Sequence, residues 1–310
     1  MKYKRILMNV CLIVLAALTV TNSAFAGASG ANAKGYIAAP QGLSGILLYS
    51  HYSSANETYL NGQENEAYED FKVDQTTWVC RPVYYFGIGS FTATIQALVP
   101  FADVSLDATL KTQAGPFSIS ESRSGLADPT ILGAVWLINN PKSKTWLGIS
   151  EWVNMPFGKY DNERILNIGD NRWGFKTELG FVKGFGNFYV DLIPKVEIFT
   201  NNDDHRFSDG SVVTSEKDPV YGFEGHLSYD FIAGHSPLSL ALDYNYAKGG
   251  EETIRDVEQN KEMDDHALQL SLTYGLTPNQ KLLFQFQKDL EVENGPKGHK
   301  FGLRYTLLFF

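Results

Sequence analysis

The chain has 310 residues, of which 44% are hydrophobic and 13% aromatic, with 35 acidic and 26 basic side chains. The resulting net charge of −9 argues against nucleic acid as a partner, because phosphate backbones attract basic surfaces. Twenty-eight glycines and only two cysteines suit many turns and half-buried strands, and they exclude a disulfide-stapled scaffold.

The first 26 residues have the three parts of a secretory signal peptide. Residues 2–5 hold three basic side chains, residues 6–20 form an apolar middle, and Ala24-Phe25-Ala26 matches the A-x-A cleavage pattern. We expect cleavage after Ala26. Cys80 is then the only thiol of the exported chain, so no intrachain disulfide can form.

Apolar and polar residues alternate with a period of two along the rest of the chain. Leu270 and Leu272 fall on one side of such a segment, whereas Gln269 and Ser271 fall on the other. This pattern is typical of strands with one apolar and one polar face. It predicts twelve strands, over residues 42–53, 73–86, 90–102, 128–138, 144–156, 172–183, 187–200, 219–231, 237–248, 265–275, 281–290 and 299–309.

Long and short connections alternate between these strands. The longest clean apolar run, Ile131 to Ile138, is far shorter than the ~20 residues that a membrane-spanning helix needs. Tight turns at one end and long loops at the other are typical of an outer-membrane barrel, with the loops outside the cell. A soluble β-sandwich would also alternate, but its loops are not sorted by length. We therefore predict an all-β, antiparallel, up-and-down transmembrane β-barrel of about 12 strands over residues 41–310, located in the bacterial outer membrane.

Both ends of the predicted barrel suggest further contacts. Residues 27–40 are rich in Gly and Ala, and we expect a flexible N-terminal segment that either hangs in the periplasm or folds back into the lumen. The chain ends on Phe309 and Phe310, and such an aromatic end is expected to be read by the barrel-insertion machinery. Outer-membrane lipid and lipopolysaccharide are the other expected macromolecular partners.

Loop residues carry a family resemblance. They include Gly125-Leu126-Ala127-Asp128-Pro129, Pro156-Phe157-Gly158-Lys159-Tyr160, Asn167-Ile168-Gly169-Asp170-Asn171-Arg172-Trp173, Asn201-Asn202-Asp203-Asp204 and Gly249-Gly250-Glu251. With these residues the chain resembles the outer-membrane transporter family named for the meta pathway of phenol degradation. The resemblance runs from about Gly42 to the C-terminus and implies import of aromatic compounds.

Enzymatic and metal sites have weak support in the sequence. His235-Ser236 resembles part of a nucleophile elbow but lacks its final glycine, and no outward Ser and His pair of an outer-membrane phospholipase is found. The run from Asn201 to His205 could supply oxygen ligands to Ca²⁺, but it lacks the spacing of a calcium loop. We expect no catalytic residue, no metal and no cofactor, and no energy-coupling segment is recognised.

Charged residues on the polar strand faces are the candidates for a pore lining. With opposite signs nearly balanced, they predict no strong ion selectivity, and pairing across the lumen is as good an interpretation as a pore lining. They are Arg81, Lys176, Glu178, Asp191, Lys195, Glu197, Glu224, His226, Asp230, Asp243, Lys300 and Arg304. The favoured function is an outer-membrane channel for passive uptake of small solutes, with aromatic or hydrophobic compounds suggested by the resemblance. The alternative is a non-transporting barrel that acts as an adhesin or envelope scaffold through its loops.

Overall fold

The computed structural model describes residues 31–207, 209–232 and 237–309. The predicted signal peptide, residues 27–30 and Phe310 therefore lie outside the described residues. In the part of the chain that the structure describes, no helix is long and apolar enough to cross a membrane.

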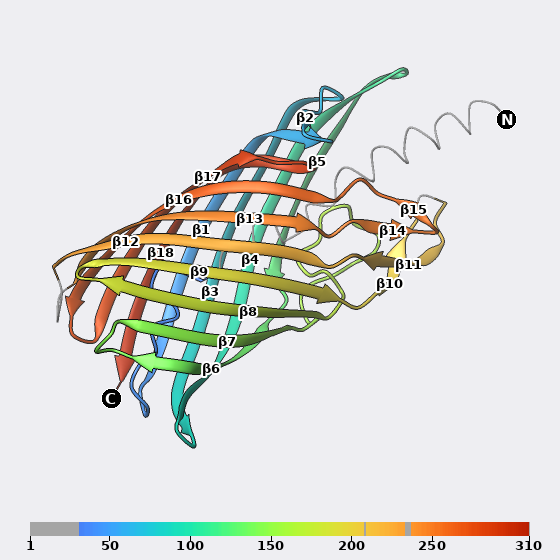
Figure 1. Cartoon of the computed structure of the whole chain (residues 1–310). Helices are drawn as coiled ribbons and strands as arrows, with labels where there is room; N and C mark the ends of the chain where they lie inside the picture. The colour runs from blue at the N-terminus through green and yellow to red at the C-terminus, as the bar shows by residue number, and fades with distance from the viewer. Residues whose placement is uncertain (1–30, 208, 233–236, 310) are drawn as a thin grey trace.

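Twelve antiparallel strands in the described residues form a closed barrel (Figure 1), which confirms the predicted fold class. The barrel closes because β18 pairs with β1 from Ser44 opposite Phe309 to Tyr59 opposite Gly295. Its strands are β1 (Ser44–Leu60), β3 (Tyr68–Ile88), β4 (Phe91–Thr112), β6 (Thr130–Asn140), β7 (Thr145–Asn154), β8 (Gly174–Phe185), β9 (Phe188–Phe199), β12 (Val220–Ile232), β13 (Leu238–Gly249), β16 (Met263–Thr277), β17 (Gln280–Glu291) and β18 (Gly295–Phe309).

The barrel is apolar outside and polar inside, as the alternation predicts. Leu270 and Phe301 point outward and are 52% and 50% exposed, whereas Asp243 and Gln269 point inward and are buried. Such an arrangement suits a protein whose outer surface contacts lipid and whose interior satisfies polar groups internally.

Several strands extend beyond the predicted boundaries. β1, β3 and β4 continue into residues 54–72 and 103–112, which the sequence pattern assigns to polar connections. Short strands β2 (Gln63–Glu64) and β5 (Gly115–Leu126) pair with these extensions, and the hairpin between β4 and β5 projects from the barrel end (Figure 1). The prediction fails here because the polarity of the two faces is reversed. In the β4 extension Val104, Leu106 and Leu110 are buried on the inner face, whereas Asp103 and Asp107 are exposed on the outer face, so no lipid-facing apolar stripe marks it as strand.

A second small sheet stands at the end of the barrel that carries the long connections. It consists of β10 (Asn202–Arg206), β11 (Val212–Lys217), β14 (Glu252–Ile254) and β15 (Val257–Glu258). The Asn201–His205 run considered for Ca²⁺ lies largely in β10, where Asn202 accepts a hydrogen bond from Asn171 and Asp204 accepts one from Asn162. No group of three or more metal-ligating side chains occurs within the described ranges.

Candidate functional site

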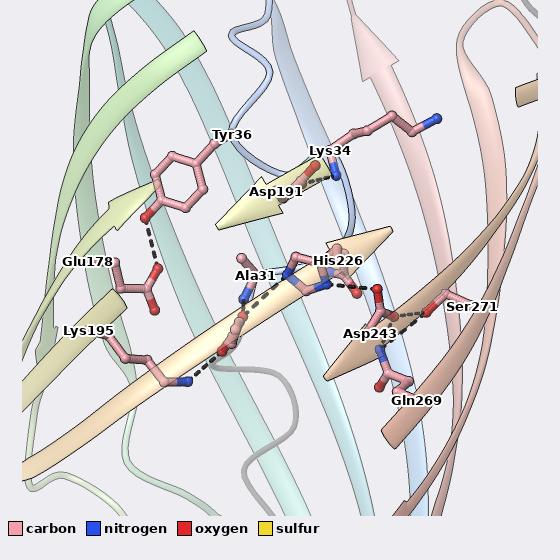
Figure 2. Close-up of polar contacts among 12 residues, drawn as sticks. Ala31, Lys34, Tyr36, Glu178, Asp191, Lys195, His226, Asp243, Gln269 and Ser271 are labelled. Carbon is pink, nitrogen blue, oxygen red and sulfur yellow. Dashed lines mark hydrogen bonds and ion pairs between the residues drawn. The ribbon is translucent and has the colours of Figure 1, made fainter. Parts of the chain in front are cut away.

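Residues 31–40 lie inside the barrel, so of the two locations that the sequence left open, the structure places this segment in the lumen. We call residues 31–40 the plug. The Ala31 amide donates to Glu224 Oε2 at 2.9 Å, and the Lys34 amide donates to Asp191 Oδ2 at 2.5 Å (Figure 2). The Lys34 ammonium pairs with Asp230 and donates to Ser239 Oγ. Carboxylates of β9 and β12 therefore hold the start of the plug.

Tyr36 fastens the plug to the adjoining wall, which β6, β7 and β8 form. Its hydroxyl donates to Glu178 Oε2 at 2.8 Å (Figure 2). The same hydroxyl lies 2.6 Å from Ser150 Oγ, and the Tyr36 carbonyl accepts from Trp136 Nε1 at 2.6 Å. The ring packs on Gly180, where an added Cβ would stand 2.1 Å from the ring. Glycine is needed at 180 because any side chain would occupy the space of the Tyr36 ring.

Several charged side chains of the lumen are paired with one another. Lys176 Nζ lies 2.8 Å from Glu178 Oε1 and 4.0 Å from the Trp152 ring centroid, and Lys195 pairs with Glu224. On the adjoining strands β12, β13 and β16, Asp243 joins His226, Gln269 and Ser271 by hydrogen bonds of 2.6 to 2.8 Å (Figure 2). Burying such charges is favourable only when each finds a partner.

The predicted site residues fall into three groups in the structure. The largest group touches the plug or its immediate partners: Lys176, Glu178, Asp191, Lys195, Glu224, His226, Asp230 and Asp243. Arg81 and Arg304 instead form a pair of cations around Tyr49, and Arg81 also donates to Gln96. Glu197 and Lys300 each line a cavity described next.

Two cavities lie inside the barrel, and Lys195 lines both of them. One has a volume of about 220 Å³ and a mainly apolar wall that includes Leu98, Trp152 and Phe199, with Lys176 and Lys195 among its polar groups. The other, of about 170 Å³, adjoins Ala31 and Asn32. A third pocket, of only about 20 Å³, is lined by Ala33 and Lys34 together with wall residues such as Leu283, so the plug packs closely against the wall there.

The connection between β7 and β8 bends inward over the larger cavity. Leu166 and Ile168 are fully buried against an apolar cluster on the β3 and β4 extensions. Asp128 anchors this loop, because its Oδ1 accepts from the Gly158 amide at 2.8 Å and its Oδ2 accepts from the Asp170 amide at 2.7 Å. A Cβ at Gly158 would stand 2.6 Å from Asp128 Oδ1, so only glycine permits this approach.

This anchor explains three of the sequence motifs, since 125–129, 156–160 and 167–173 meet at Asp128 although they are far apart in the chain. The Lys159 amide also donates to the Leu126 carbonyl at 2.8 Å. Burial, followed by the nearby Asp170 carboxylate, raises the pKa of Asp128 to about 7, against the opposing effect of the two amide donors. The anchor therefore titrates near neutral pH.

We expect the loop to loosen as the pH rises from 5 to 8. The folded pKa of Asp128, about 7, lies above the unfolded value of 3.8, so its contribution to loop stability is complete below pH 4 and is lost as the pH rises through 7. The hydrogen-exchange protection factors of the Gly158 and Asp170 amides should fall roughly tenfold to a hundredfold over this pH interval. Asp128→Asn should remove the pH dependence. A wild-type profile as flat as that of the variant would contradict the assignment.

Sequence reasoning missed the plug residues and Asp128 as parts of the site. Tyr36 is the single aromatic residue between Gly27 and Pro40. A lone aromatic side chain in a segment rich in Gly and Ala indicates that the segment packs against the rest of the protein. In the sequence, the glycines at 158 and 169 carry only the family resemblance. In the structure, they let two loop segments approach the Asp128 carboxylate.

The fold and the occupied lumen define a class of protein, the outer-membrane channel barrels. A COG4313 outer membrane channel from Pseudomonas putida F1 superposes with a TM-score of 0.76 at 27% identity, covering 88% of this chain and 98% of that one. The β domain of the Bordetella autotransporter BrkA and the translocator domain of NalP from Neisseria meningitidis share the fold, each with a TM-score of 0.53 at 10% identity. The match to BrkA covers 86% of this chain and 100% of that one, and the match to NalP covers 95% of this chain and 99% of that one.

The chain belongs to the family described as "Putative MetA-pathway of phenol degradation", which matches residues 55–305. This confirms the resemblance that the loop motifs indicated. No curated protein matches the chain.

Proposed function

We propose that this protein is a passive outer-membrane channel for small aromatic solutes and that the plug keeps it closed. The observation that carries the proposal is the 220 Å³ cavity with its mainly apolar wall, reached from the side of the long loops. An apolar cavity of about 150 Å³ holds benzene, so the volume suits a molecule with one aromatic ring. Trp152 contributes part of its ring to this wall beside Lys176, whose Nζ lies 4.0 Å from the ring centroid, and such polar groups can orient a hydroxyl substituent.

The comparisons with known proteins support the same proposal independently. The family description refers to phenol degradation, and the similar COG4313 protein is described as an outer membrane channel. The lumen as a whole carries charges of both signs among the described residues, since the carboxylates pair with Lys176, Lys195 and His226 while Arg81 and Arg304 lie around Tyr49. We infer that solute polarity rather than ionic charge is the basis of selection.

Uptake of labelled phenol tests the proposal. Cells that lack their general porins and produce this chain should take up phenol at micromolar concentration several-fold faster than cells without it, and excess toluene should compete. A pentose of comparable size serves as the control solute and should show a smaller gain. Trp152→Ala should weaken the preference for phenol, since loss of one aromatic contact in the cavity wall costs roughly 1 kcal/mol, or about fivefold.

The scaffold function is the second candidate, and one observation favours it. Several lumen charges form ion pairs, and the pocket between the plug and the wall at Lys34 has a volume of only about 20 Å³, as expected of a barrel that does not conduct. Equal phenol uptake with and without the chain, also after removal of the plug, would favour the scaffold over the channel.

A further inference from the structure

An apolar groove of about 540 Å³ runs over the outer wall of the barrel, where β1, β13, β16, β17 and β18 lie next to one another. Its walls are outward side chains of Leu270, Leu272, Phe284, Phe286, Phe301 and Leu303. Ser50 occupies the position between Leu303 of β18 and Trp78 of β3, and its short side chain leaves the space that these larger neighbours border.

Basic side chains stand directly above one end of this groove. Lys288 and His299 face each other across β17 and β18, one outward position beyond the pair Phe286 and Phe301. The His299 ring packs on Phe301 with centroids 5.5 Å apart, whereas Lys288 is exposed. Within the described ranges, no carboxylate forms an ion pair with Lys288.

The carboxylates of this part of the outer wall are already engaged. Asp264 pairs with Lys248 at 2.8 Å and lies 3.7 Å from His266, and Asp74 pairs with Lys72 at 2.8 Å. Glu291 lies 3.9 Å from His266. Lys288 is thus an exposed cation at the end of the apolar outward band that is free to pair with an anion from outside the chain.

The rim of the groove lies toward the long connections. β17 begins after the tight turn at residues 278–279 and ends at the connection over 292–294, and Lys288 is near the latter end. If the long connections are extracellular, as typical of such barrels, Lys288 and His299 lie at the level of the outer-leaflet headgroups. That leaflet of the outer membrane is built from lipopolysaccharide, whose lipid A part combines phosphate groups with several acyl chains.

We propose that this groove is a binding site for one lipopolysaccharide molecule, with an acyl chain of lipid A in the groove and a lipid A phosphate at Lys288. The match is chemical on both sides: the wall of leucine and phenylalanine side chains accepts hydrocarbon, and the ammonium and imidazole donors face the phosphate. Interfacial lysines attract anionic headgroups in the same way at other membrane surfaces.

Native mass spectrometry on the delipidated full-length barrel with added bisphosphorylated lipid A tests the site. The wild type should retain one lipid A per barrel. Lys288→Glu should weaken binding at least about tenfold, because it replaces a charge-assisted contact by a repulsive one. Ser50→Phe fills the groove and should weaken binding without any change of charge. Lys142→Glu, in an exposed turn at the other end of the barrel, makes the same charge change and should bind as the wild type does.

The unboiled gel mobility of each variant verifies that the barrel is folded, so loss of binding cannot be confused with loss of fold. Lys288→Glu binding as tightly as the wild type would overturn the site, as would equal binding of lipid A without its phosphates. If phosphatidylglycerol binds as tightly as lipid A, the occupant is a phospholipid and the assignment to lipopolysaccharide is wrong. None of these measurements depends on transport.

Discussion

Removal of the plug should convert the barrel from a closed to a conducting state. With residues 31–40 deleted, we expect single-channel conductance in planar bilayers to rise at least about tenfold above that of the full chain, because a barrel of this size is too wide for its own side chains to fill. Eight strands give an interior that side chains can fill and sixteen leave an aqueous channel, so twelve strands fall between these cases. The plug takes up this remaining space, and Asp191, Glu178 and Glu224 are its main acceptors.

The deletion also exposes these carboxylates to the open lumen. Asp191, Glu224 and Asp230 lose the plug groups that they now bind, namely two backbone amides and the Lys34 ammonium. The open state should therefore favour cations, and added salt should reduce this preference because charges are screened over about 10 Å at 0.1 M. Conductance that stays at the level of the full chain would show that the inward loop anchored at Asp128, rather than the plug, closes the barrel.

The strand pattern of the sequence predicted the barrel well, because lipid imposes a two-residue period on the outer face. Leu270, Leu272 and Phe301 all lie outward where this period places them. Most predicted strand ends lie within two residues of the observed ends where the strand is in the membrane. Beyond the lipid-facing band the two-residue period of β4 continues, but its apolar residues, such as Val104 and Leu106, lie on the inner face and its outer face is polar. Without an apolar outer stripe, the extensions of β3 and β4 went unrecognised.

The candidate site could be predicted only in part, and the reason is physical. Inward charges such as Glu178 and Asp191 could be placed on one wall from their spacing, but their partners come from Tyr36 and Lys34, about 140 and 160 residues away in the chain. No local pattern carries such a pairing. The same holds for Asp128, whose donors lie 30 and 42 residues further on.

A single methyl group at position 180 should open the closed channel. In Gly180→Ala the new Cβ would stand 2.1 to 2.3 Å from three atoms of the Tyr36 ring, so the ring must leave its place and its hydroxyl loses Glu178 and Ser150. We expect frequent opening events in planar bilayers where the wild type stays closed. The loss of one buried hydrogen bond to a carboxylate costs roughly 1.5 to 3 kcal/mol, enough to raise the open fraction at least about tenfold.

Gly133→Ala is the matched control for this substitution. Gly133 also lies in a barrel strand, but an added Cβ there meets no atom within 4 Å, so the channel should stay as closed as the wild type. A Tyr36→Ala background completes the test. Once the Tyr36 ring is absent, Gly180→Ala should cause almost no further increase in the frequency of opening events. If the two substitutions at 36 and 180 act additively, position 180 influences opening by some route other than the Tyr36 ring. If Gly180→Ala conducts no more than Gly133→Ala, the contact of Tyr36 with β8 does not hold the plug in place.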